Sequence, residues 1–284
     1  MDKSRIVVGY DGSDESRRAL DWAAGEAERT GAPLRIVHTY QVSWPAGTYY
    51  RATAEEAEAA RGLAEQLAAA AVARVRARGT GIDAAATAVH APAATTLLDF
   101  GDGTTRLLVV GNRGAGGITN LLMGSVSQQV ATHARVPVVV VRGHAAPAGP
   151  VVVGVDGSPV TDVALGLAFD AAAALGTHVV AIRAYNPPSP SVLPLSAVEA
   201  TEREMLEASV ASWQDRYPSV RLEARLAVGR TAKVLIGASS TAQLVVVGSR
   251  GHGGFTGLLL GSVGQQLMHH AECPVLIVHK PKTT

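Results

Sequence analysis

The 284 residues suffice for one large domain or two ordinary ones, and 47% of them are hydrophobic, so the chain can bury a substantial core. Charged residues make up only 17%, which argues against a disordered chain. The formal net charge is +1, with 15 basic and 14 acidic residues up to residue 149 and 10 of each after it. Neither half is therefore the polycation that nucleic acid or an anionic membrane attracts.

The chain shows no signal for export or membrane insertion. Its single cysteine, Cys273, excludes an intramolecular disulfide. The opening Met-Asp-Lys-Ser-Arg carries no apolar signal region, and no run of about 18 apolar residues occurs. We therefore expect a cytoplasmic protein that binds neither membrane nor nucleic acid.

Strand-like and helical segments alternate along the first half. Strands are predicted over 5–10, 34–39, 83–89, 107–111 and 138–142. Helices are predicted after Ser13, which can cap the first one, and over 55–78, 95–100 and 126–133. Three of the strands are continuous apolar runs, which is typical of parallel strands covered on both faces. The alternation predicts βαβ units and a parallel sheet.

The second half repeats the first. The segment IVVGYDGS, residues 6–13, matches VVVGVDGS at 151–158, and LLVVGNRG, residues 107–114, matches LVVVGSRG at 244–251. Each copy then reaches Gly-Ser after nine residues and ends on an apolar strand that follows a proline. Landmarks repeated in one order indicate a duplicated fold. We predict domains over 1–143 and 151–284, joined by a short linker over 144–150.

A glycine-rich loop follows the fourth strand of each copy, in the pattern Gly-x2-Gly-x9-Gly-Ser. Glycine permits positive φ and lets the backbone approach a ligand without a Cβ. The loop N–H groups could surround phosphate oxygens, and the helix that opens at Gly124-Ser125 favours an anion at its start. The pattern is neither a Walker A loop nor a dinucleotide fingerprint. The loop glycines of the first copy are Gly111, Gly114, Gly116 and Gly117.

This pattern resembles the nucleotide signature of the universal stress protein family, Gly-x2-Gly-x9-Gly-[Ser/Thr], in the branch that binds ATP. The resemblance covers both copies nearly end to end. It implies α/β architecture with two tandem doubly wound domains, each a five-stranded parallel sheet in the order 3-2-1-4-5 flanked by helices. It also implies pairing through the fifth strands, and hence an intrachain pseudo-dimer and a homodimer of whole chains.

The resemblance further implies one ATP site in each copy, with Mg²⁺ accompanying the nucleotide. The aspartate after strand one lies at the adenine end, and the end of strand two lies by the base. The end of strand four, the glycine loop and the next helix start complete the site, and the loop arginine is a further candidate for the phosphates. In the first copy the site residues are Asp11, Thr39, Val110, Gly111, Arg113, Gly114, Gly124, Ser125 and Val126. In the second copy they are Asp156, Ala184, Val247, Gly248, Arg250, Gly251, Gly261, Ser262 and Val263.

The two copies differ before the third helix. The second copy reads Val228-Gly229-Arg230, with a glycine common in the family, where the first reads Val89-His90-Ala91. This difference predicts a narrower or reshaped first site, and so unequal affinities. A proline-rich loop with Ser189, Ser191 and Ser196 could cover the second site.

Simpler interpretations exist for several of these residues. Asp11 and Asp156 could be plain turn residues, since Asp-Gly is a common turn dipeptide. Ser125 and Ser262 could be ordinary helix N-caps, and the loop arginines could be solvated charges. Cys273 precedes a proline and is expected to be buried and unreactive.

The leading functional hypothesis is a regulator that binds ATP with little turnover. The loop holds no lysine, and no carboxylate is evidently placed to orient water or cage Mg²⁺. One alternative is a slow ATPase or adenylyl-transfer enzyme in which Asp11 serves as metal ligand or base. Another alternative keeps the site but changes the ligand to AMP or cyclic AMP.

Overall fold

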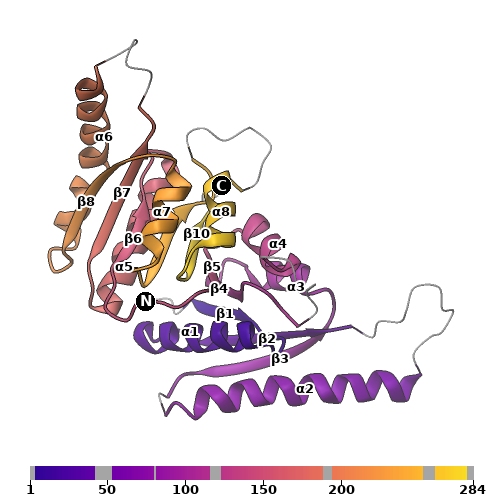
Figure 1. Cartoon of the computed structure of the whole chain (residues 1–284). Coiled ribbons are helices and arrows are strands. Elements are labelled where there is room, and N and C mark those ends of the chain that lie inside the picture. The colour runs from indigo at the N-terminus through magenta and orange to yellow at the C-terminus, as the bar shows by residue number, and fades with distance from the viewer. Residues whose placement is uncertain are drawn as a thin grey trace, which may run out of the picture. The chain divides into compact units, whose positions relative to one another are not determined.

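The structure is a computed structural model that describes residues 4–41, 53–79, 81–115, 123–187, 194–251 and 260–279. The chain divides into two compact units, Met1–Val141 and Arg142–Thr284 (Figure 1). The segment predicted as a linker, 144–150, is hydrogen-bonded within the second unit. The His144 N–H donates to the Glu272 carbonyl at 2.8 Å, and the Ala146 N–H donates to the Ala242 carbonyl at 3.1 Å.

The first unit alternates strands with helices throughout. Its elements in chain order are β1 (Arg5–Gly9), α1 (Asp14–Thr30), β2 (Leu34–Tyr40), α2 (Ala54–Arg76), β3 (Ala84–His90), α3 (Ala93–Phe100), β4 (Thr105–Gly111), α4 (Ser125–His133) and β5 (Val138–Val141).

The second unit repeats that order. Its elements are β6 (Val151–Gly154), α5 (Pro159–Leu175), β7 (Val179–Tyr185), α6 (Leu195–Arg216), β8 (Leu222–Val228), α7 (Thr231–Ser239), β9 (Leu244–Gly248), α8 (Ser262–His270) and β10 (Val275–Val278).

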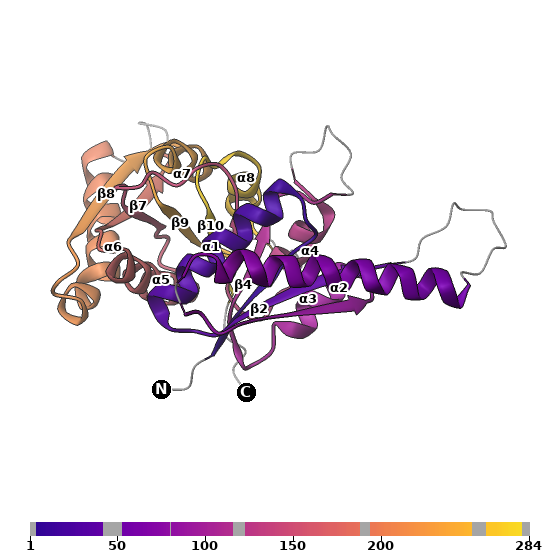
Figure 2. The same cartoon turned by 90° about the horizontal axis from the view of Figure 1, so that it is seen from below.

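Each unit is a doubly wound α/β domain. The strands of the first unit lie in the order β3-β2-β1-β4-β5 and those of the second in the order β8-β7-β6-β9-β10, which is 3-2-1-4-5 in both. All of these pairings are parallel. In the first unit α1 and α2 pack together on one face of the sheet, while α3 and α4 pack together on the other (Figures 1 and 2). The predicted fold class is confirmed.

The apolar strand runs form the core of each unit. The middle of β1 and all four residues of β5 are buried, as are the four residues of β10. Both faces of such strands are covered, so a continuous apolar run is favoured over an alternating one. Helix α1 starts as predicted, because the Ser13 side chain accepts a hydrogen bond from the Ser16 N–H.

The order of the strands places the candidate loops side by side. In the first unit the chain moves outward from β1 to β2 and β3, then crosses back to β4 on the other flank of β1. The loops after β1 and after β4 therefore leave the same edge of the sheet from adjacent strands. Ligands of open α/β sheets bind at such a reversal.

Candidate functional site

A cavity of about 220 Å³ lies at this reversal in the first unit. Every residue predicted for the first copy lines it, so the fold brings the whole predicted set together. The lining also includes residues that the sequence had not singled out, namely Gly9, Tyr10, Ser16, Val37, Ala93, Leu97 and Ser127.

One wall of the cavity is apolar. Val37 comes from β2, Val110 from β4 and Leu97 from α3. A Cβ at Gly9 would stand 2.9 Å from Leu97 Cδ1, so the missing side chain lets α3 pack closely against β1. A flat apolar group is the ligand moiety that such a wall accommodates.

The start of α4 also lines the cavity. Gly124 is the N-cap, with φ −78° and ψ 149°, and no side chain caps the helix; Ser125 is its first helical residue. In the second unit Gly261 is the N-cap and Ser262 the first residue of α8, again without a side-chain cap. The interpretation of both serines as N-caps is therefore wrong, because the extended glycine already occupies the capping position. The first-turn N–H groups of α4 have no side-chain cap, a feature that suits an anion.

Close packing, not left-handed backbone, explains the glycines of the loop. None of the described loop glycines has positive φ, contrary to one of the reasons for expecting glycine there. A Cβ at Gly111 would lie 2.9 Å from the backbone C and O of Glu15, and one at Gly124 would lie 3.3 Å from Arg113 Cα. Gly116 and Gly117 lie outside the described residues.

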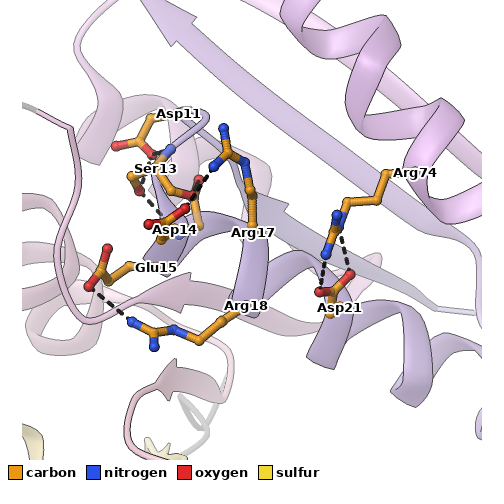
Figure 3. A network of polar contacts seen from close by, with 9 residues as sticks. Asp11, Ser13, Asp14, Glu15, Arg17, Arg18, Asp21 and Arg74 are labelled. Carbon is orange, nitrogen blue, oxygen red and sulfur yellow. Dashed lines mark hydrogen bonds and ion pairs between the residues drawn. The ribbon is translucent and has the colours of Figure 1, made fainter.

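Asp11 joins the two loops. Its Oδ1 accepts hydrogen bonds from the Ser13 N–H at 3.0 Å and the Ser13 hydroxyl at 2.6 Å, as the close-up in Figure 3 illustrates. Its Oδ2 accepts the N–H of Ala115, in the glycine loop, at 2.8 Å. Burial raises the pKa of Asp11, but the hydrogen bonds from Ser13 and Ala115 lower it more, so the net pKa lies below its ordinary value. Asp11 thus stabilises the turn after β1, as expected for an Asp-Gly turn, and also accepts a hydrogen bond from the glycine loop.

The loop arginine has a carboxylate neighbour. Arg113 lines the cavity with its side chain 43% exposed, 4.0 Å from Glu15 Oε1. Glu15 also pairs with Arg18 at 3.0 Å, as Figure 3 shows. An exposed pair at this distance contributes little to stability, so Arg113 stays available to a ligand.

The second unit reproduces the main contacts. Asp156 Oδ1 accepts hydrogen bonds from the Ser158 N–H at 2.9 Å and the Thr161 hydroxyl at 2.6 Å. The Gly261 N–H donates to the Ser249 carbonyl at 2.7 Å, as the Gly124 N–H donates to Asn112 at 2.8 Å. Ala184 lies near the end of β7, and Val247 and Gly248 end β9. Arg250 is exposed beside them.

Strand pairing corrects one comparison between the copies. Tyr40 pairs with His90 on β3, and Tyr185 pairs with Val228 on β8, so His90 corresponds to Val228. The residue in the place of Gly229, which has φ 135°, is therefore Ala91 and not His90. The first copy still lacks the glycine, with Ala91 in its place, and a difference in shape and affinity between the two sites stays a prediction.

Other candidate groups fall outside the site. Cys273 is buried, and burial raises the pKa of its thiol to about 12, which agrees with the expectation of an unreactive residue. Ser196 belongs to α6 and not to a loop, while Ser189 and Ser191 lie outside the described residues. Among the residues that the structure describes there is no cluster of potential metal ligands, and no described helix is long and apolar enough to cross a membrane.

Comparison with known proteins bears on both halves of the chain. The model of the universal stress protein family matches residues 3–142 and 148–279. The chain belongs to the universal stress protein family. A universal stress protein of Mycolicibacterium smegmatis is 39% identical over 284 residues, which cover 96% of each chain. The predicted family, in tandem form, is confirmed.

One solved structure of the family shares the fold of the whole chain. The crystal structure of a universal stress protein from Archaeoglobus fulgidus covers 99% of this chain and 100% of its own, with a TM-score of 0.73 and 18% identity. A shorter universal stress protein from Archaeoglobus fulgidus, solved in complex with dAMP, is 27% identical and covers 49% of this chain and 97% of its own, with a TM-score of 0.36.

Proposed function

We propose that this universal stress protein binds ATP in each unit and acts as a cytoplasmic, nucleotide-dependent regulator of the stress response with little turnover. The observation that carries the proposal is the single cavity in which every predicted residue of the first copy meets. The Gly-x2-Gly-x9-Gly-Ser pattern, present in both copies, supports the same role for the second unit.

The described residues fit such a ligand. The apolar wall of Val37, Leu97 and Val110 suits an adenine ring, and the start of α4 with Arg113 suits phosphates. The volume of about 220 Å³ lies below the roughly 300 Å³ at which ligand pockets usually begin. Residues 116–122 of the loop lie outside the described part of the chain, so this volume refers to the described walls alone.

The polar groups at the cavity support binding over hydrolysis. Asp11 is the one carboxylate, and Arg113 the one cation, among the described residues of the lining. Three hydrogen bonds from the protein occupy three of the roughly four acceptor positions of the Asp11 carboxylate. A general base or a metal ligand needs an oxygen lone pair that faces the water or the ion, and these bonds leave Asp11 little capacity for either role. ATP would supply the chemical signal here, and the chain would hold and orient it.

The direct test is to identify nucleotides that remain with the purified protein. We expect ATP in the extract after denaturation, measured by mass spectrometry, and slow ADP release in a multiple-turnover assay. Calorimetry with ATP, ADP, AMP and cyclic AMP ranks the ligands. Rapid hydrolysis would favour the enzyme hypothesis, and tighter binding of AMP or cyclic AMP than of ATP would replace the proposed ligand.

We also propose that the fifth strands join the two copies as an intrachain pseudo-dimer and that whole chains form a homodimer in addition. Each fifth strand is a run of four apolar residues, Val138–Val141 in one copy and Val275–Val278 in the other. Light scattering at several protein concentrations gives the mass of the particle in solution. The mass of one chain at all concentrations would contradict the homodimer.

A further inference from the structure

The carboxylate of Asp11 connects parts of the first unit that lie far apart in sequence. Its Oδ2 receives the backbone N–H of Ala115, which is 104 residues away, at 2.8 Å. Its Oδ1 is held in place by the N–H and hydroxyl of Ser13. Both oxygens therefore act as acceptors, one toward the loop after β1 and one toward the glycine loop after β4.

Gly114 makes room for this contact. A Cβ built on Gly114 would lie 2.4 Å from Asp11 Oδ2, far inside van der Waals contact, and its other neighbour within 4 Å is the carbon of the same carboxylate. Gly114 has no positive φ, so the left-handed conformation that favours glycine does not explain the residue here. The carboxylate is thus the one described obstacle to a side chain at this position.

The second unit repeats this arrangement on different partners. A Cβ on Gly251 would also lie 2.4 Å from Asp156 Oδ2, and Gly251 again has no positive φ. The hydroxyl on Asp156 Oδ1 comes from Thr161, whereas Ser13 supplies it to Asp11. The close approach of the carboxylate to the second loop glycine persists although the residue that donates its hydroxyl to the carboxylate has changed.

We propose that Asp11 and Asp156 are positioning residues that latch the glycine loop through its backbone, and that the second glycine of the Gly-x2-Gly pattern exists to admit the latch. The inference deepens the proposed function, on which it rests for its effect on ligand affinity. The latch holds the start of the loop, at Gly114 and Ala115, in place, so its loss raises the dissociation constant for ATP by leaving this segment to be ordered on binding.

The first test measures the loop without nucleotide. Asp11→Asn keeps the size of the side chain but leaves one acceptor oxygen for two sets of donors, so one side of the latch is lost. In hydrogen–deuterium exchange of the full chain we expect the peptide that contains Ala115 to exchange about tenfold faster or more, since a hydrogen bond to a charged group is removed. Unchanged exchange in that peptide would overturn the proposal.

The second test separates the latch from a general need for glycine. Gly114→Ala must displace the Asp11 carboxylate and should therefore accelerate hydrogen exchange in the same peptide. The matched control Gly103→Ala has open space at its Cβ and should leave that exchange unchanged. Because Asp11→Asn and Gly114→Ala break one contact, the double variant should exchange no faster than the faster single variant. Additive acceleration would contradict the proposal.

The second unit provides an independent reading if Asp11→Asn fails to fold. Asp156→Asn should accelerate hydrogen exchange in the peptide that contains Gly251 and leave exchange in the peptide that contains Ala115 unchanged. Unchanged exchange in the Gly251 peptide would count against the latch. These readings do not need a ligand. If the loops open as expected but calorimetry detects no nucleotide at all, the latch stands and the proposed function fails.

Discussion

The two units share backbone contacts at both ends of the glycine loop but differ in the side chains beside them. Both place a glycine as N-cap of the helix after the loop, and both set an aspartate against the second loop glycine. The side chains around these shared contacts differ: Val160 stands where the first unit has Glu15, beside the glycine that ends the fourth strand. The backbone positions of the proposed phosphate site are retained, while the charge beside them differs.

The two units also differ in which element carries a threonine hydroxyl: the second strand in the first unit, and the start of the third helix in the second unit. Thr39 at the end of β2 and Ala93 at the start of α3 both line the first cavity. The corresponding residues of the second unit are Ala184, near the end of β7, and Thr231, at the start of α7. The pair of side chains keeps its total volume, but the hydroxyl comes from the strand in the first unit and from the helix in the second. If both proposed sites hold phosphates in the same way, this difference lets them contact the rest of a ligand differently.

The largest expected effect concerns the shared helix start. Ser125→Ala and Ser262→Ala should each weaken the binding of ATP to the altered unit by about 10- to 100-fold. The reason is that a hydrogen bond to a charged phosphate contributes roughly 1.5–3 kcal/mol. Titration calorimetry should resolve one weakened site of two and a smaller loss for AMP. Equal losses for ATP and AMP would place these serines away from the terminal phosphates.

A smaller effect should separate the two strand-four glycines. Gly111→Ala meets the backbone of Glu15 at 2.9 Å, which cannot easily move, whereas Gly248→Ala meets the Val160 side chain and the Arg250 carbonyl at 3.1 Å. We expect Gly111→Ala to destabilise its unit by about 1–3 kcal/mol, as overpacking does, and Gly248→Ala by less. Urea unfolding followed by unit-specific exchange measures both. Equal costs would mean that the difference at Glu15 and Val160 does not matter for packing.

The charge difference should change affinity only modestly. Glu15→Val frees Arg113 from its carboxylate neighbour and should strengthen ATP binding at the first unit, while Val160→Glu should weaken it at the second. Interactions of exposed pairs amount to roughly 0.2–1 kcal/mol and are screened by salt, so the change should be a few-fold and fade at high ionic strength. Calorimetry at two salt concentrations checks this. A change that is independent of salt would indicate a steric cause.

Lowering the pH from 7 to about 5 should have the smallest effect, which is measured as the protection of the peptide that contains Ala115. The pKa of Asp11 is lowered, so the stability that its charged form contributes is present above the ordinary aspartate pKa and is lost only as the pH falls through the lower folded value. Protection of the peptide with Ala115 should hold from pH 7 to about pH 5 and decline below about pH 4. Exchange corrected for its intrinsic pH dependence measures it. Loss of protection near pH 6 would require another titrating group.

The sequence alone was enough for the duplicated architecture and for nine of the residues that line the first cavity. Apolar strand runs, glycines at strand ends and motifs repeated in order are local patterns, and the shared ends of parallel strands bring them together. Asp11, Gly111 and Ser125 could therefore be named before the fold was known.

Tertiary structure decided what those residues do to one another. The bond from Ala115 to Asp11 joins residues far apart in sequence, and no local pattern reports it. Strand pairing showed that Ala91, and not His90, is the counterpart of Gly229 in the first copy. The sequence could not show this because the copies differ in length between their landmarks. Leu97 entered the lining through the packing of α3. Periodicity and motif spacing describe a segment by itself, whereas contact, register and the reason for a glycine depend on what the folded chain places beside it.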